Sequence, residues 1–178
     1  MGYQGGLGHR VPHQESPEKL TGDVFIDPGV GSVTAGILVG VHPTEPFSRV
    51  VLDEYYHDAD RVGRLADIIH WNRMQAKWNI RRGFIDPDGA NFKMVAAPFP
   101  LHNVRKDFEE GVQVTNNALH AGQLFISAGC SNLLGECSSL EWNLQGTNSK
   151  AGQPDHAADC LRYAAMEYWP PGTTKLYI

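Results

Sequence analysis

Two aspartates stand directly after short apolar runs that are typical of buried β-strands. Asp27 ends the stretch "VFID" and Asp86 ends the stretch "GFID". A single carboxylate in such a place is most often a turn former or a helix cap. If the two strands are neighbours, however, the carboxylates repel each other unless a cation lies between them. Because carboxylate oxygens are the ligands that Mg²⁺ and Mn²⁺ prefer, the pair is a candidate metal site.

A second group of polar residues lies near the C-terminus, in "PDHAADCLRYAAMEY" at residues 154–168. Asp155 and Asp159 are four residues apart, so a helix places them on one face, with His156 on an adjoining edge. The small residues between them would let this helix pack closely on a sheet. In the alternative interpretation, Pro154 begins the helix, Asp155 complements its dipole and His156 is a surface residue.

The order of the expected elements decides whether Asp27 and Asp86 can meet. Sequence patterns predict strands at 23–26, 34–41, 49–56, 83–85 and 123–126, and helices at 60–79, 104–121, 131–142 and 155–168. Short turn-rich links favour an antiparallel meander for the first three strands. The next helix is a crossover that adds a parallel strand beside the first. We therefore expect an α/β fold, a mixed central sheet flanked by helices, with Asp27 and Asp86 at adjacent strand ends.

Composition and charge narrow the class of protein. The 178 residues are enough for one domain with a real core, which we expect at 21–170, between a linker or tail at 1–20 and a C-terminal tail at 171–178. The net charge of −5 gives no general attraction to phosphates. Three cysteines without C-x-x-C spacing are expected to be buried thiols. No apolar run has the length of a membrane span, and no signal peptide is visible, which favours an intracellular protein.

Three segments together resemble the C-terminal nuclease domain of bacteriophage large terminase subunits, in the RNase H-like (retroviral integrase) superfamily. They are "VFIDPGVGSVTAGILV", "RGFIDPDGANF" and "DHAADCLRYA", and the resemblance extends over about residues 21–169. It implies that Asp27 and Asp86 are metal ligands on the first and fourth strands. On the last helix it makes Asp155, His156 and Asp159 candidates, of which Asp159 and His156 are favoured. The implied cofactors are two Mg²⁺ or Mn²⁺ ions.

The activity that this resemblance implies is metal-dependent endonuclease cleavage of concatemeric double-stranded viral DNA, with little sequence specificity, in the cytoplasm of an infected bacterium. The implied partners are an ATPase domain, the portal and the small terminase subunit, with no membrane. No G-x-x-x-x-G-K-[ST] phosphate loop occurs, so the ATPase is expected elsewhere. The alternatives are another RNase H-like nuclease, such as a junction resolvase or transposase core, or a non-catalytic DNA- or portal-binding module.

Other charged residues receive secondary roles. DNA-backbone contacts would come from some of the nearby cations: Lys93, Arg81, Arg82, Arg105, Lys106 and Lys150. Asp88, in "DPDG", is expected to cap a turn. Glu54 is expected on a solvated strand face, with an outer role at the metal site as the alternative.

Overall fold

A computed structural model describes residues 10–11, 20–28, 33–87, 97–140 and 153–171, and the side chains among them other than those of 10–11 and 58–67. Its strands are β1 (Arg10–Val11), β2 (Thr21–Asp27), β3 (Val33–Val41), β4 (Arg49–Asp58), β5 (Asn79–Ile85), β6 (Leu101–Asn103) and β7 (Leu124–Ser127). Its helices are α1 (Ala59–Lys77), α2 (Phe108–His120), α3 (Ser131–Ser139) and α4 (His156–Tyr168).

The strands form one seven-stranded sheet in the order β1-β7-β4-β3-β2-β5-β6. β2, β3 and β4 are the antiparallel meander that the sequence predicts. β5 returns parallel to β2 after the helix α1, and the other neighbours are parallel as well. The expected crossover beside the first strand is therefore confirmed.

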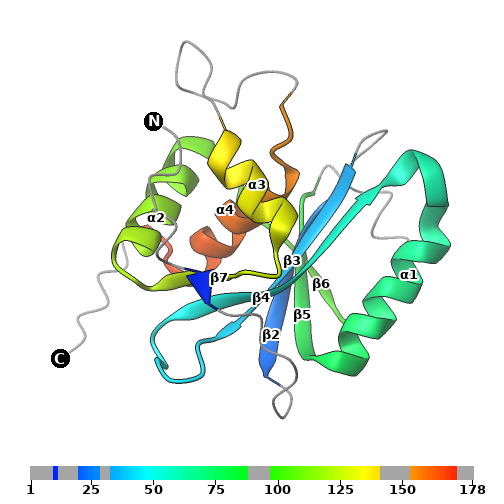
Figure 1. Ribbon diagram of the computed structural model, residues 1–178, viewed down its shortest axis with the longest axis horizontal. Helices are drawn as coiled ribbons and strands as arrows, with labels where there is room; N and C mark the ends of the chain where they lie inside the picture. Colours follow the sequence, from blue (N-terminus) through cyan, green and yellow to red (C-terminus); the bar gives the residue numbers. More distant parts are fainter. Residues whose placement is uncertain (1–9, 12–19, 29–32, 88–96, 141–152, 172–178) are drawn as a thin grey trace.

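The sheet has a core on each face because apolar residues of its central strands alternate between the two. Figure 1 shows α2, α3 and α4 on one side and α1 on the other. Phe25 of β2 belongs to the core under α2, α3 and α4. Its neighbours Val24 and Ile26 belong to the core under α1, together with Trp71 and Trp78. The small residues of α4 lie buried against the sheet, as the sequence predicts.

Some elements differ from the sequence prediction. β5 begins at Asn79, earlier than expected, and the three-residue β6 was not predicted. β1 lies within the segment expected to be a linker or tail and pairs with β7. α2 begins at Phe108, later than expected, because the side chain of Asp107 caps it by accepting a hydrogen bond from the backbone N–H of Glu110.

Two expectations about the chain as a whole can be compared with the fold. The cysteines carry free thiols, of which Cys130 and Cys160 are buried and Cys137 is half-buried. Among the described residues, no helix has the length and apolar character needed to span a membrane.

Candidate active site at adjacent strand ends

Asp27 and Asp86 lie side by side at the ends of β2 and β5. The last paired residues are Ile26 and Ile85, and the backbone N–H of Asp86 donates to the carbonyl of Ile26 over 3.3 Å. Two residues earlier on each strand, Phe25 and Phe84 stack with ring centroids 5.0 Å apart in the core under α4. Since strand side chains alternate with a period of two, Asp27 and Asp86 follow these rings onto the α4 side of the sheet.

Helix α4 brings His156 to this edge. His156 Nδ1 lies 2.7 Å from Asp27 Oδ2, and both side chains are largely buried. This hydrogen bond raises the pKa of His156, although burial of the imidazole opposes the shift. The structure thus joins two residues that are far apart in the sequence and that the sequence assigned to one site.

Asp159 lies one turn further along α4, on the inner side of the helix. Burial raises the pKa of its carboxyl to about 6, an effect that Arg162 opposes and that the nearby charges of Asp27 and Asp155 reinforce. Arg162 Nη2 lies 2.9 Å from Asp159 Oδ1. Asp159 is therefore a carboxylate close enough to Asp27 to feel its charge, and it is held by a cation of its own helix.

Arg162 is itself fixed by packing between α4 and α2. Its guanidinium lies over the rings of Phe108 and Tyr163, 4.9 Å from each centroid. Its aliphatic stem passes Gly111 of α2, where an added Cβ would lie 2.5 Å from Arg162 Cγ. The buried guanidinium therefore orients the Asp159 carboxylate from a position with little freedom to move.

Asp86 has its own partners. Lys106 Nζ lies 2.7 Å from Asp86 Oδ2, and the hydroxyl of Tyr163 donates to the same oxygen over 3.1 Å. Burial is the main cause that raises the pKa of Tyr163, which keeps its hydroxyl a donor. The mutual repulsion expected between the acids is thus offset within the protein by His156 on Asp27, Lys106 on Asp86 and Arg162 on Asp159.

Asp155 is the N-cap residue of α4, and its carbonyl accepts from the backbone N–H of Asp159 over 2.8 Å. Glu136 of α3 accepts a hydrogen bond from the first turn of α4. Its Oε2 accepts from the backbone N–H of Ala158 over 2.9 Å, and its Oε1 accepts from the hydroxyl of Tyr56 over 2.7 Å. The sequence did not reveal Glu136, because its partners are distant along the chain.

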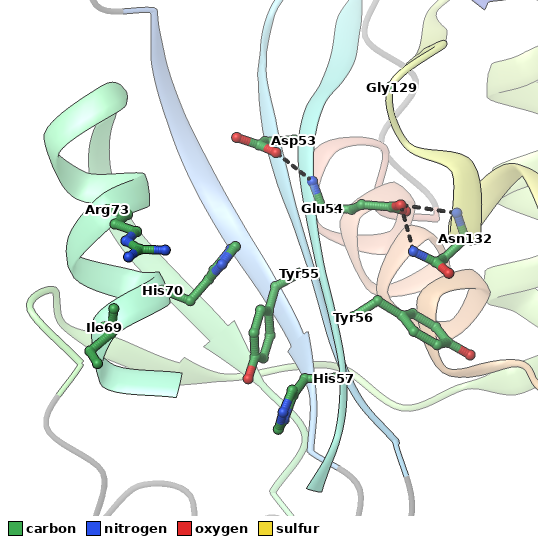
Figure 2. A pocket seen from close by; sticks show the side chains of 10 residues that line it. All are labelled: Asp53, Glu54, Tyr55, Tyr56, His57, Ile69, His70, Arg73, Gly129 and Asn132. Atoms are coloured by element: carbon green, nitrogen blue, oxygen red, sulfur yellow. Dashed lines mark hydrogen bonds between the residues drawn. The ribbon is translucent and has the colours of Figure 1, made fainter. Parts of the chain in front are cut away.

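Glu54 has a role that the sequence prediction missed. It caps α3 (Figure 2), whereas the sequence predicted a solvated strand face, and its alternative outer role at the metal site stays a prediction. Its Oε1 accepts from the backbone N–H and the side-chain amide of Asn132, and its Oε2 accepts from the backbone N–H of Leu133, each over 2.9 Å. The sequence did not reveal these bonds because α3 packs beside β4, a contact between elements far apart along the chain.

A separate pocket of about 550 Å³ lies along the later half of β4, where β7 no longer pairs (Figure 2). It is lined by Asp53, Glu54, Tyr55, Tyr56, His57, Ile69, His70, Arg73, Gly129 and Asn132. The ring of Tyr55 lies between those of His57 and His70, with centroids 5.8 and 4.5 Å away. In the described part of the chain, this lining includes none of the candidate site acids.

The donor chemistry of the strand-end site suits a hard divalent cation, since it offers carboxylate oxygens and one imidazole nitrogen. Over the residues that the structure describes, however, no three His, Cys, Asp or Glu side chains already form a group that could hold a metal ion. The side chains are therefore of the right chemical type to bind such an ion. A metal ion at Asp86 would compete with Lys106 for the same carboxylate.

The cations expected to contact DNA are spread over different places. Arg81 and Arg82, before the buried end of β5, form ion pairs with the buried Asp23, at 3.0 and 3.4 Å. Arg105 is exposed beside Lys106. Lys93, Lys150 and Asp88 fall outside the described residues.

Comparison with known proteins bears on the fold. No protein-family profile and no curated protein sequence matches the chain. The large terminase of a thermophilic bacteriophage, solved in complex with ADP, superposes with a TM-score of 0.68 at 20% identity, over 89% of this chain and 42% of that one. This chain thus spans less than half of that ADP-bound terminase.

Isolated nuclease domains match over most of both chains. The P22 large terminase nuclease domain gives a TM-score of 0.68 at 11% identity, over 89% of this chain and 86% of that one. The large terminase nuclease of the thermophilic phage G20c, solved with bound magnesium, gives 0.65 at 9% identity, over 94% and 98%. At such identities the likeness concerns the fold, and this chain therefore has the RNase H-like fold of the nuclease domains of bacteriophage large terminases.

Proposed function

We propose that this chain is the metal-dependent endonuclease domain of a phage DNA-packaging terminase, cutting concatemeric double-stranded DNA with little sequence specificity. The observation that carries the proposal is the convergence of Asp27, Asp86, His156 and Asp159 from β2, β5 and α4, in the fold of terminase nucleases. The G20c nuclease was solved with magnesium, which supports a divalent cofactor for this chain as well.

The proposed ligands of two Mg²⁺ or Mn²⁺ ions are Asp27, Asp86, Asp159 and His156, with Asp155 as a further candidate. Such ions, when bound, would supply Lewis-acid stabilisation of the phosphate and a more acidic water. In the proposed hydrolysis, the water oxygen bonds to phosphorus as the bond from phosphorus to the 3′ oxygen breaks. The water gives up one proton and the 3′ oxygen takes one up from solvent, so the products are a 3′ hydroxyl and a 5′ phosphate.

The protein's own residues orient the groups around this reaction. Asp27 holds the imidazole of His156 through Nδ1, and Arg162 holds the carboxylate of Asp159. Tyr163 fixes one oxygen of Asp86. Preorganisation of this kind lowers the cost of arranging charged groups around a reacting phosphate.

The wider assembly is part of the same proposal. Because the chain spans 42% of the phage terminase that was solved with ADP, we propose that an ATPase domain works with this one. We also propose the portal and the small terminase subunit as partners, and the cytoplasm of an infected bacterium as the place of action.

The test is a plasmid-cleavage assay with Mg²⁺ or Mn²⁺ and without ATP. Asp27→Asn and Asp86→Asn should each lower the rate at least about 100-fold, since each removes charge stabilisation of several kcal/mol from the transition state. Asp53→Asn, which alters a half-buried acid on β4 that pairs with Lys77, should keep the parental rate. If both site variants cut as fast as the parent, the assignment is wrong, and faster cutting of four-way junctions than of linear DNA would favour a resolvase.

A further inference from the structure

The chain after β6 places a lysine beside the acids. β6 lies parallel to β5 at the edge of the sheet (Figure 1). Asn103 of β6 is paired with Ile85 of β5. The backbone N–H of Val104 donates to the carbonyl of Ile85 over 3.0 Å, which extends the alignment by one residue. Lys106 follows three residues after the end of β6, so Asp27, Asp86 and Lys106 lie at or just beyond the same ends of three neighbouring parallel strands.

Lys106 lies between Asp86 and the solvent. The Asp86 side chain is 11% exposed, whereas that of Lys106 is 39% exposed while its Nζ stays 2.7 Å from Asp86 Oδ2. Arg162, the cation that pairs with Asp159, is only 6% exposed, and its guanidinium lies over the rings of Phe108 and Tyr163. Of these two cations, only Lys106 can therefore meet a phosphate that approaches the acids from outside.

We propose that Lys106 is a catalytic residue: Asp86 holds its ammonium at the site before metal binds, and the ammonium contacts the phosphodiester that is cut. The inference rests on the proposed function and names a substrate contact within that site. As the water oxygen bonds to phosphorus and the 3′ oxygen leaves, negative charge grows on the non-bridging oxygens. The ammonium stabilises that charge and keeps its own protons, so no proton passes through Lys106.

A purely structural role for Lys106, the neutralisation of Asp86, makes different predictions. In that case the loss of Lys106 would lower stability in EDTA, yet it would not change how DNA binding depends on salt. Stronger metal binding at the freed Asp86 is expected under either role, so the salt dependence separates the two. A phosphate contact, in contrast, adds to the number of counterions that DNA releases on binding.

The experiment compares Lys106→Met with a matched control, Lys77→Met. Lys77 is 38% exposed and pairs with Asp53 over 3.2 Å on the α1 side of the sheet, so the control removes a similar ion pair away from the acids. DNA binding is measured against salt concentration in EDTA, and again with Ca²⁺ in place of Mn²⁺. Cleavage at saturating DNA is measured with Mn²⁺, and melting curves confirm that each variant is folded.

Lys106→Met should reduce the slope of log affinity against log salt by about 0.9 and the cleavage rate by about 100-fold, while Lys77→Met changes neither. An unchanged slope in both EDTA and Ca²⁺ overturns the proposal, whatever the rate. If Lys106→Met does not fold, Lys106→Arg is compared with the uncharged Lys106→Gln. Lys106→Arg should keep the parental slope of log affinity against log salt. Equal cleavage rates in these two variants would overturn the proposal. A parent chain that binds but does not cut DNA would contradict the proposed function, and the slopes would still decide on Lys106.

Discussion

The pairing of Asp27 with His156 leads to a prediction about stability that can be measured without DNA. Asp27→Asn removes the charge that the imidazole faces at 2.7 Å, with side chains only 15% and 25% exposed. A hydrogen bond to a charged group contributes about 1.5–3 kcal/mol. In a domain of this size, 1 kcal/mol corresponds to about 2–4 °C, so the variant should melt about 3–12 °C below the parent in EDTA at pH 6.

The pH dependence follows from the raised pKa of His156. A histidine whose pKa is higher in the folded than in the unfolded protein stabilises the fold fully below its ordinary pKa of about 6.5. This contribution is lost as the pH rises through the higher, folded value. The gap between parent and Asp27→Asn should therefore be widest near pH 6 and should narrow toward pH 9.

Metal adds a second, separate difference between the parent and this variant. With free Mn²⁺ at about 100 times its dissociation constant, an ion that binds only the folded chain stabilises it by about 2.7 kcal/mol. Asp27→Asn should lose most of this gain because it lacks a proposed ligand. The control is Asp53→Asn, which removes the charge that accepts from Lys77 and Trp78 at 3.2 and 2.8 Å and should keep the full Mn²⁺ shift. A variant at Asp27 that melts like the parent in EDTA and responds fully to Mn²⁺ would refute both the pair and the metal assignment.

Two further predictions concern the packing that positions α4. Glu136→Ala leaves the Tyr56 hydroxyl and the Ala158 N–H without their acceptor, each at a cost of about 1–3 kcal/mol. In urea unfolding, Glu136→Ala should therefore lower the free energy of unfolding more than Tyr56→Phe does. Equal decreases for the two variants would contradict the capping role. Gly111→Ala places a Cβ 2.5 Å from Arg162 Cγ. The resulting rearrangement of Arg162 or of the two helices, α2 and α4, should cost about 1–3 kcal/mol, despite the better helix propensity of alanine. A melting temperature above that of the parent would contradict the close packing.

The parts of the fold that the sequence predicted are those with long apolar patterns. β2, β3 and β4 are joined by short links, and α1 is long enough to carry the chain back to a parallel strand. β6 escaped prediction because its residues, Leu101–Asn103, are few and partly polar; pairing with β5 makes it a strand. β1, of two residues, is likewise produced by a tertiary partner, which no local pattern reveals.

The candidate site divides in a similar way. Asp27 and Asp86 could be predicted to meet because parallel neighbours bring their carboxyl ends to one edge of a sheet. The Asp159–Arg162 pair has helical i,i+3 spacing and could have been predicted from the sequence. Lys106 and Glu136 could not, because their partners come from other elements, far along the chain.

Long-range hydrogen bonds connect β4 to α3, α3 to α4, and α4 to the proposed catalytic residues. Glu54 of β4 caps α3, and Glu136 of α3 caps α4. α4 then presents His156 to Asp27 of β2, so the position of the imidazole depends on carboxylates that touch no candidate ligand.

The same arrangement bears on metal affinity. If the acids had no partners, binding of Mg²⁺ or Mn²⁺ would be favoured by relief of the repulsion between them. In this structure, however, Asp86 and Asp159 already form ion pairs with Lys106 and Arg162. The free energy of metal binding is therefore a difference between two sets of charge interactions, since each new ligand bond replaces an ion pair. Because Lys106 is far more exposed than Arg162, exchange at Asp86 should require less rearrangement of the core than exchange at Asp159. A phosphate that attracts the Lys106 ammonium would favour that exchange, which couples binding of DNA to binding of the ion.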